Sequence, residues 1–431
     1  MDKRRTIIID DDPTGCQTVR DVPILLDMDE ELLRATLRNH KELFILTNTR
    51  AMDSVYAGKV SRELCSVLYD IAVSDGYDFS IISRSDSTLR GHVREELEPI
   101  METFPGHGRL VLAPAFFECG RVTEHDIHYL LKDGSKTAVG LTEFASDPTF
   151  GYRNSNLRLW IEEVSGGRFK ANDCVSLNVE TCDFDILSQS GENSIFIVNA
   201  SCYEELDTLV DRIKKVEAGG LRFTFRTAAS FVRSYLGQTF SEYVRPATNG
   251  NNGLIVVGSY TELTTRQVNY LKENGKIKCF ELDVNDLSEA NCKMLAKEID
   301  TALSSNDCLL YTSRTYCEPK EGEVQLDFAE RVTSALCSVV KSLSFVPGFI
   351  MAKGGITSLT VARDALEMRQ TVVLGQIAAG IPVWLDGNAN PFVVFPGNVG
   401  EDDTLYKLFS FFCKLREIND KTIWTFKKYR K

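Results

Sequence analysis

The sequence lacks the residue patterns on which most metal, redox and membrane functions depend. Its twelve cysteines include no Cys-x-x-Cys pair, and among its five histidines only His125 and His128 lie close together. This spacing argues against a zinc site, and cysteines scattered through apolar segments are typical of a reducing compartment. No apolar run reaches the length of a membrane span, and the start of the chain turns acidic too soon for a signal peptide. We therefore expect a cytoplasmic protein.

An excess of positive charge is also absent. The formal net charge is −12, which argues against a general nucleic-acid binder and against a protein that binds anionic membranes. An anionic small substrate would need local arginines or a metal ion. The remaining composition, 43% hydrophobic and 26% charged, is that of an ordinary globular protein, and 431 residues suffice for two domains.

The first half contains an unusual acidic turn in the segment Thr6–Thr18, TIIIDDDPTGCQT. Its three isoleucines predict a strand buried on both faces, as in a parallel sheet covered by helices. Ligands bind such sheets at the carboxyl ends of the strands, where Asp10, Asp11 and Asp12 lie. A single aspartate there would most often cap a turn. Three adjacent carboxylates repel one another, so we favour a binding site, with Asp10 only ending the strand.

Polar clusters also follow the next two buried strands, Glu42–Thr47 and Phe79–Ile82. Their arginines can hold a carboxylate by two-pronged hydrogen bonds, while the aspartates accept hydroxyl protons. An acid that carries several hydroxyl groups requires both, arginines for its carboxylate and aspartates for its hydroxyls. The alternative is that Arg84 pairs with Asp86, or that Arg90 caps a helix. The candidates from this reasoning are Arg50, Arg84, Arg90, Asp11, Asp12 and Asp86.

Strand-like and helix-like segments alternate along the whole chain, which predicts an α/β protein. The segment Ser241–Gly253, SEYVRPATNGNNG, is dense in Pro, Asn and Gly and has no apolar period, so it predicts a linker. We therefore predict two domains, residues 1–240 and 254–431, joined by residues 241–253. Each is expected to contain a largely parallel sheet flanked by helices.

Three turns of the second half run from a strand into glycine and small hydroxyl residues. They begin at Gly258, Gly354 and Pro396. Glycines let the backbone approach a ligand closely, and a following helix offers free N–H groups, an arrangement that suits phosphates. Packing alone explains any one such turn, but three in one domain favour phosphate binding. Neither the P-loop nor the Gly-x-Gly-x-x-Gly pattern is present, so a nucleotide would bind by a different loop.

Several of these segments resemble the four-carbon acid sugar kinase family. The matches follow the family's order over nearly the whole chain and comprise Asp11–Gly15, Asp86–Gly91, Ala113–Phe116 with Gly120 and Arg121, Lys353–Ser358 and Pro396–Gly400. The resemblance implies an N-terminal acid-sugar-binding domain and a C-terminal nucleotide-binding domain. It further implies phosphorylation of a hydroxyl of a four-carbon sugar acid, of threonate, erythronate or 3-oxo-tetronate type, with ATP and Mg²⁺.

The resemblance, taken with the residue types, also predicts site residues. Those expected to bind the substrate are Asp11, Asp12, Arg50, Arg84, Ser85, Asp86, Ser87 and Thr88, and those expected to bind ATP are Ser259, Gly354, Gly355, Ile356, Thr357, Gly397 and Gly400. We expect Asp12 or Asp86 to orient or deprotonate the reacting hydroxyl. Many members carry Glu where this chain has Ile356, so no magnesium ligand is assigned.

Two other functions stay open at this point. A non-catalytic sensor or effector that binds the acid sugar or ATP would share the arginines and the glycine turns, and Ile356 favours it. An ATP-dependent ligase would need a second, nucleophilic substrate. The sequence specifies neither the stereochemistry of the substrate nor the hydroxyl that reacts, and it leaves open whether the protein is a homodimer.

Overall fold

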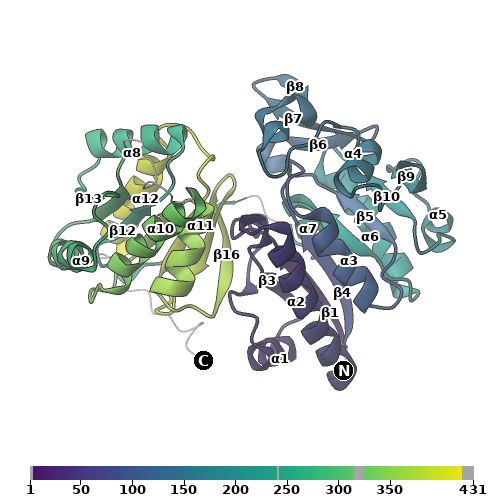
Figure 1. Ribbon diagram of the computed structural model, residues 1–431, viewed down its shortest axis with the longest axis horizontal. Helices are drawn as coiled ribbons and strands as arrows, with labels where there is room; N and C mark the ends of the chain where they lie inside the picture. Colours follow the sequence, from purple (N-terminus) through teal and green to yellow (C-terminus); the bar gives the residue numbers. More distant parts are fainter. Residues whose placement is uncertain (1–2, 240–241, 315–324, 420–431) are drawn as a thin grey trace. The chain divides into compact units, whose positions relative to one another are not determined.

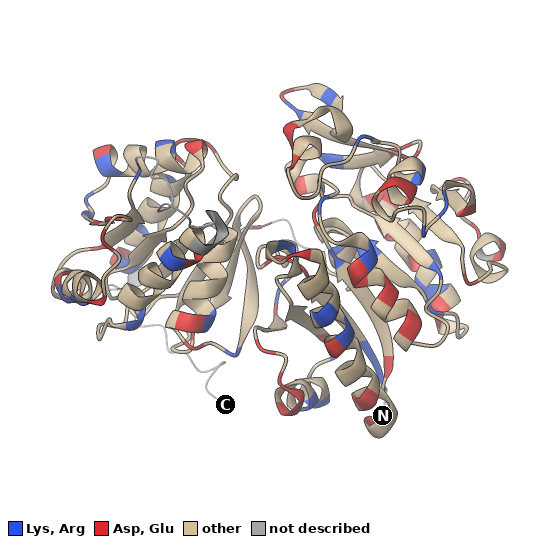
Figure 2. Ribbon diagram, viewed as in Figure 1, with Lys and Arg blue, Asp and Glu red and all other residues tan. Residues whose placement is uncertain are grey.

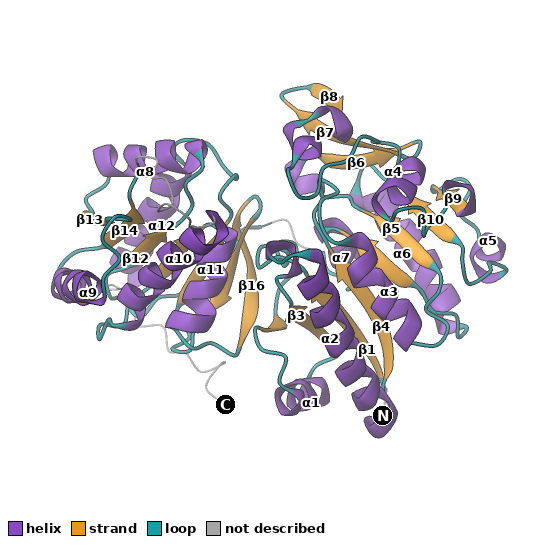
Figure 3. Ribbon diagram, in the orientation of Figure 1, coloured by secondary structure: helices purple, strands orange, loops and turns teal. Residues whose placement is uncertain are grey.

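The computed structural model describes residues 3–239, 242–314 and 325–419 (Figure 1). The chain divides into two compact units, Met1–Glu242 and Tyr243–Lys431. In each unit a mostly parallel sheet is flanked by helices, which confirms the predicted fold class (Figure 3). Ser241, at the start of the predicted linker, lies outside the described residues. Within the described residues, no helix combines the length and apolar character needed to cross a bilayer.

The sheet of the first unit is parallel, with strand order β2-β3-β1-β4-β11-β5-β10-β9. The interior strand β1 holds the isoleucine run, and Ile7 and Ile8 are fully buried because helices cover both faces of the sheet. The strands are β1 (Arg4–Asp10), β2 (Val22–Leu25), β3 (Glu42–Leu46), β4 (Asp78–Arg84), β5 (Leu110–Ala113), β9 (Cys174–Leu177), β10 (Ile195–Val198) and β11 (Thr224–Thr227).

Helices cover both faces of this sheet. Ile7 packs in one core with apolar residues of α1, α2 and α3, whereas Phe225, which points to the other face, contacts the rings of Phe231 and Tyr235 on α7. Figure 2 shows acidic and basic residues interspersed along α2 and α3, as on a solvated face. The helices are α1 (Glu30–Asn39), α2 (Ser54–Asp75), α3 (Val93–Thr103), α4 (Leu157–Val164), α5 (Phe184–Ser188), α6 (Tyr203–Ala218) and α7 (Ala229–Tyr235).

A small antiparallel sheet follows β5 in the first unit. It contains β6 (Arg121–Glu124), β7 (Ile127–Lys132) and β8 (Ser135–Ala138), and the β7–β8 hairpin turns at Asp133 and Gly134, both with positive φ. His128 on β7 is fully buried. This sheet therefore contributes at least one fully buried side chain to the first unit.

In the second unit the described strands have the order β13-β14-β12-β15-β18-β17-β16; β17 pairs antiparallel with β16 and β18, and the other pairings are parallel. Helices α8 and α12 pack on one face, and α10 and α11 lie over the other (Figure 1). The strands are β12 (Leu254–Val257), β13 (Lys278–Leu282), β14 (Cys308–Thr312), β15 (Ile350–Lys353), β16 (Gln370–Ala378), β17 (Ile381–Leu385) and β18 (Pro391–Phe395); the helices are α8 (Glu262–Asn274), α9 (Glu289–Leu303), α10 (Gln325–Lys341), α11 (Gly355–Thr360) and α12 (Thr404–Asn419).

Candidate substrate and nucleotide sites

The polar clusters predicted in the first half meet at one edge of the sheet. Asp10, the last residue of β1, is in register with Leu46 at the end of β3 and with Arg84 at the end of β4. The segment that follows β3 also binds the backbone of the acidic turn. Thr47 N–H donates to the Asp10 carbonyl at 2.9 Å, and Arg50 N–H donates to the Asp11 carbonyl at 3.3 Å. Segments more than thirty residues apart are thus brought into contact.

Arg50 connects three of the predicted aspartates. Its Nε and Nη2 donate to the two carboxylate oxygens of Asp11, at 3.1 and 2.5 Å, and its Nη1 lies 3.4 Å from Asp12 Oδ2 and 4.0 Å from Asp86 Oδ1. Thr14 N–H donates to the other oxygen of Asp12 at 2.7 Å. Burial opposes ionisation of Asp12, but Arg50, Arg84 and Thr14 outweigh it and lower the pKa of this carboxyl. Asp12 is therefore ionised at neutral pH.

Asp10 is more than the end of its strand. Arg84 Nη1 lies 3.2 Å from Asp10 Oδ1 and 3.7 Å from Asp11 Oδ1, so Arg84 pairs with these aspartates rather than with Asp86. Burial, together with the charges of its two acidic neighbours, outweighs Arg84 and raises the pKa of Asp10 to about 7. A Cβ atom at Gly15 would lie 2.0 Å from the Asp10 carboxylate, which explains the glycine of this turn.

The loop after β4 forms the other side of the cluster. Thr88 Oγ1 and Arg90 Nε both donate to Asp86 Oδ2, the latter at 2.7 Å, and Arg90 Nη1 lies 3.4 Å from Asp147 Oδ2. Although burial opposes it, the charges of Arg50 and Arg90 lower the pKa of Asp86. Asp86 is thus a second ionised carboxylate beside Arg50.

Buried side chains from outside the main sheet fix the backbone of this loop. His128 Nε2 lies 2.8 Å from the Ser87 carbonyl oxygen, and Tyr152 Oη donates to the Thr88 carbonyl at 2.7 Å. Burial lowers the pKa of His128 to about 4, so the ring is neutral and its Nε2 donates. Ser85 is held from the neighbouring strand, because its N–H donates to the Thr227 carbonyl at 2.7 Å. All four residues predicted from Ser85 to Thr88 therefore lie in an ordered, supported loop.

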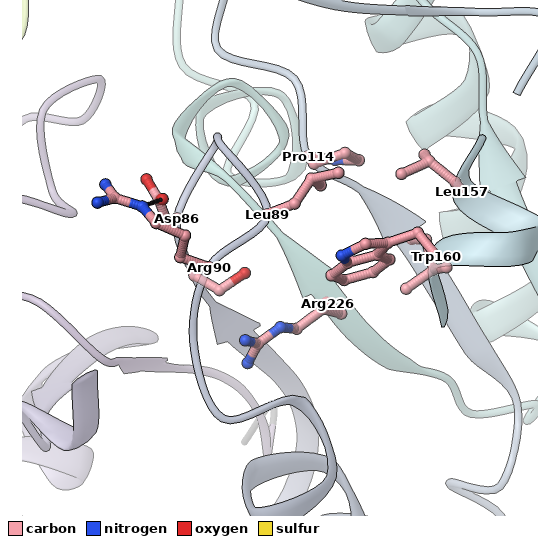
Figure 4. Close-up of a pocket in the computed structure, with 9 residues that line it drawn as sticks. Asp86, Leu89, Arg90, Pro114, Leu157, Trp160 and Arg226 are labelled. Carbon is pink, nitrogen blue, oxygen red and sulfur yellow. Dashed lines mark hydrogen bonds and ion pairs between the residues drawn. The ribbon is translucent and has the colours of Figure 1, made fainter. Parts of the chain in front are cut away.

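A small cavity lies beside this loop (Figure 4). Figure 4 shows Asp86 and Arg90 on one side of it and Leu157 and Trp160 on the other. Trp160 Nε1 and Arg226 Nε are buried and have no hydrogen-bond partner among the described residues. Both residues line the cavity, whose volume of about 10 Å³ has room for about one water molecule. The lining residues are Ser85, Asp86, Leu89, Arg90, Leu112, Pro114, Leu157, Trp160 and Arg226.

Sequence reasoning missed Arg226. It lies on β11, is 3% exposed, and its Nη1 donates to Ser83 Oγ at 3.0 Å and pairs with Glu96 Oε2. A Cβ atom at Gly91 would lie 3.0 Å from Arg226 Nη2 and 3.1 Å from Asp11 Oδ2, so this arginine adjoins the acidic turn. The one signal in the sequence is a charged residue inside the short buried strand TFRT.

In the second unit the three glycine turns are neighbours. Val257, Lys353 and Phe395 end β12, β15 and β18 and are in register with one another. Space between the turns is small: a Cβ atom at Gly397 would lie 2.8 Å from Ser259 Oγ, and one at Gly354 would lie 3.0 Å from Thr357 Oγ1. Gly354 also has φ +116°, which favours glycine. Glycines thus let three backbone segments meet at one edge.

Hydroxyl groups surround this meeting point. Ser259 Oγ lies 3.0 Å from Thr264 Oγ1, and Thr264 Oγ1 donates to the Gly397 carbonyl at 3.0 Å. Gly355 and Ile356 begin α11, and the Ile356 side chain is 57% exposed. Gly400 has φ +89° and lies in the turn before α12. The structure therefore groups the residues predicted to bind ATP around the ends of β12, β15 and β18.

Lys353 was not predicted as a site residue. It is fully buried, and its Nζ donates to the carbonyl oxygens of Pro396 at 2.7 Å and Gly397 at 3.3 Å. Burial lowers the pKa of this ammonium group to about 7.

Among the described residues, no group of three His, Cys, Asp or Glu side chains could hold a metal ion. The hydroxyl and backbone groups at the glycine turns do not by themselves form a magnesium site. Such a site more often uses one or two carboxylates together with substrate phosphates and water.

Comparison with protein families decides the family. The model described as "Sugar-binding N-terminal domain" matches residues 6–235, and that described as "Nucleotide-binding C-terminal domain" matches residues 254–405. The chain belongs to the four-carbon acid sugar kinase family. It therefore combines a sugar-binding and a nucleotide-binding domain, as the sequence resemblance predicted. No curated protein matches this chain.

Solved structures of low sequence identity share the fold. A protein of Salmonella typhimurium LT2, provisionally described as a tRNA synthase, is 13% identical with a TM-score of 0.71 over 94% of this chain and 98% of that chain. A Haemophilus influenzae protein assigned to the DUF1537 family is 16% identical with a TM-score of 0.62 over 94% of this chain and 99% of that one. These similarities show the architecture alone.

Proposed function

We propose that the protein is an ATP-dependent kinase that phosphorylates a hydroxyl of a four-carbon sugar acid of threonate, erythronate or 3-oxo-tetronate type. The observation that carries the proposal is the pairing of two sites in one chain. The sugar-binding unit ends four neighbouring strands in a cluster of aspartates and arginines, and the nucleotide-binding unit ends three neighbouring strands in glycine turns.

The aspartates divide into two classes, which suggests their roles. Burial raises the pKa of Asp10 and, against the opposing charge of Arg50, also that of Asp11. The pKa of Asp12 and Asp86 is lowered instead, so both stay ionised. An ionised carboxylate can accept a hydrogen bond from the reacting hydroxyl and take its proton as the new O–P bond forms and the bond to the ADP oxygen breaks. We therefore assign this role to Asp12 or Asp86.

The arginines differ in their access to a substrate. The side chain of Arg84 is only 4% exposed, whereas those of Arg50 and Arg90 are 17% and 23% exposed. Arg50 and Arg90 each already bind a carboxylate of the protein, and a guanidinium group has five N–H donors. We propose that these two also contact the substrate carboxylate, while Arg84 holds the acidic turn in place. Ser85, Ser87 and Thr88 would offer polar groups to the hydroxyls.

Ser259, the turn Gly354–Thr357, Gly397 and Gly400 would hold the ATP phosphates. Magnesium bound to those phosphates would neutralise charge during transfer.

The decisive experiment mixes the purified protein with ATP, magnesium and a panel of four-carbon sugar acids and measures ADP with a coupled assay. Release of ADP that depends on one of the acids, with a phosphorylated acid as product, is expected. Release of AMP that requires an added amine or other nucleophile would indicate a ligase instead.

A non-catalytic sensor is the second candidate, and the exposed Ile356 favours it because many members of the family resembled here carry Glu at this position. A sensor would bind an acid or ATP without forming ADP, so calorimetric binding with no ADP for every acid of the panel would contradict the kinase assignment.

A further inference from the structure

Lys353 is a buried lysine whose charge has no acidic partner among the described residues. Its side chain is fully buried at the end of β15, and its Nζ lies 3.8 Å from the centre of the Phe395 ring. Its hydrogen-bond acceptors are the Pro396 and Gly397 carbonyls, which are neutral. A buried ammonium group without an anion is costly in free energy, and such a position is maintained when another interaction offsets the cost.

In the part of the second unit that the structure describes, the elements packed around Lys353 bring no carboxylate to it. Strands β12 and β18 and helix α11 contain no charged residue. On the helices of the same face, α8 and α12, two basic residues form ion pairs at the surface, Lys272 donates to Tyr311 Oη at 3.1 Å, and Arg416 pairs with Asp307. Arg314, whose Nη1 donates to the Ser259 carbonyl at 2.7 Å, is itself a cation. The helix pairs are Arg266 with Glu262 and Asp402, and Lys407 with Asp403.

The hydrogen bonds of Lys353 orient the third glycine turn. The Gly397 carbonyl accepts from Lys353 Nζ and from the hydroxyls of Thr261 and Thr264. In a trans peptide the C=O and the following N–H point in opposite directions, and the bonds of this turn are trans. The N–H groups of Gly397 and Asn398 therefore point away from Lys353. N–H groups presented in this way are suited to binding an anion.

We propose that Lys353 is a positioning residue of the nucleotide site: it orients the Pro396–Gly397 peptides and supplies the buried positive charge that phosphate groups at the three glycine turns neutralise, so that nucleotide and proton bind together. This inference rests on the proposed function, since it requires that ATP binds at these turns.

The direction of the proton linkage follows from the environment of the lysine. Burial lowers the pKa of Lys353 to about 7, so the Lys353 side chain is mostly neutral at pH 8 when no nucleotide is bound. Phosphate charges nearby raise that pKa again, and the protein must take up a proton when ATP binds. ATP affinity should then fall as the pH rises above about 7, by up to about tenfold per pH unit while the bound lysine stays protonated.

Calorimetry tests this on the unmodified protein. Magnesium-ATP is titrated at pH 8, where the triphosphate is already ionised, in two buffers with different ionisation enthalpies. Uptake of about one proton per bound nucleotide is expected. Binding without proton uptake would overturn the role of Lys353 but leave the nucleotide site intact. If ATP did not bind at any pH, both this inference and the proposed kinase function would fall.

Two variants make the assignment specific to this residue. Lys353→Met removes the charge and keeps much of the volume, and it should weaken ATP binding at pH 6.5 at least tenfold and abolish proton uptake. Lys341→Met is the matched control, because Lys341 is 55% exposed and pairs with Glu367 at the surface. It should change neither quantity. A Lys353→Met protein with unchanged affinity and proton uptake would refute the inference, and if that variant fails to fold, the proton count of the unmodified protein decides.

Discussion

Each unit has its candidate site at the carboxyl ends of its own parallel strands, but the two sites consist of different chemical groups. In the first unit, side-chain charges dominate, with Asp10, Asp11 and Asp12 held by Arg50 and Arg84. In the second, backbone and hydroxyl groups meet around glycines, and the buried Lys353 donates a hydrogen bond to the Pro396 carbonyl of one glycine turn. A sugar acid presents hydroxyls and a carboxylate, whereas a triphosphate is an extended anion. The difference between the sites thus matches the difference between the proposed ligands.

The largest effect is expected from neutralising the ionised aspartates of the first unit. Asp12→Asn or Asp86→Asn should lower turnover about 100-fold or more for whichever residue accepts the hydroxyl proton, with ATP affinity unchanged. Steady-state kinetics with the accepted acid measures the loss, and Asp147→Asn, which removes the more distant partner of Arg90, serves as the control. Normal turnover in both variants would show that neither aspartate is the base.

A smaller loss is expected when Arg50 becomes Lys. A lysine cannot bind both oxygens of Asp11 and reach Asp12, so the acidic turn loses its orientation. We expect kcat/KM for the sugar acid to fall about 10- to 100-fold, corresponding to about 1.5–3 kcal/mol for charge-assisted hydrogen bonds. Arg34→Lys, at an ion pair between α1 and α2, is the matched control and should have little effect. Equal losses in both variants would contradict a site-specific role of Arg50.

The second unit offers a comparison between two glycines. Gly354 and Gly250 both have positive φ, but a Cβ atom at Gly354 would meet Thr357 and Ser259, whereas one at Gly250 would meet nothing within 4 Å. Alanine at either position should cost about 1–2 kcal/mol of folding stability. Only Gly354→Ala should weaken ATP binding, by about tenfold, because it displaces the Ser259 turn. Thermal unfolding and calorimetry separate the two effects, and equal ATP affinity in both variants would argue against phosphate contact at Gly354.

The smallest effect is expected at Ile356. Its side chain is more than half exposed, and exposed substitutions usually change stability by less than about 0.5 kcal/mol. Ile356→Ala should leave ATP affinity within about twofold, since only the backbone of this residue is expected to contact phosphate. A loss above tenfold in a titration with magnesium-ATP would show that the side chain itself binds the nucleotide.

The sequence predicted the fold class because its signals are local. The run Ile7–Ile9 predicted a buried strand, which the structure contains as β1, and the polar residues that follow parallel strands were expected at one sheet edge. The partners within the cluster could not be predicted. Arg84 binds Asp10 rather than the nearby Asp86, and Arg226 pairs with Glu96 across 130 residues of sequence. Such pairings depend on register and side-chain direction, which composition and spacing do not reveal.

Lys353 and Asp10 escaped sequence reasoning for a related reason. A lysine at a strand end usually extends its ammonium group into water, and nothing in AKGG indicates that this one is fully buried. Similarly, Asp10 was expected only to end its strand, yet it is 3% exposed and pairs with Arg84. Burial is a property of the packed structure, so the protonation of both groups could be inferred only after the fold was known. The roles predicted for the other site residues stay predictions.

The same two groups alter the electrical behaviour of the protein in a way that its formal charge hides. The value of −12 counts Asp10 as negative and Lys353 as positive, but with pKa values of about 7 each carries only about half a charge at pH 7. The two corrections cancel in the whole chain, so its electrophoretic mobility at pH 7 would reveal neither. Between pH 8 and pH 6 both groups take up protons, and each group by itself makes its unit more positive by almost one charge. Mild acidification therefore changes the charge of both candidate sites at once.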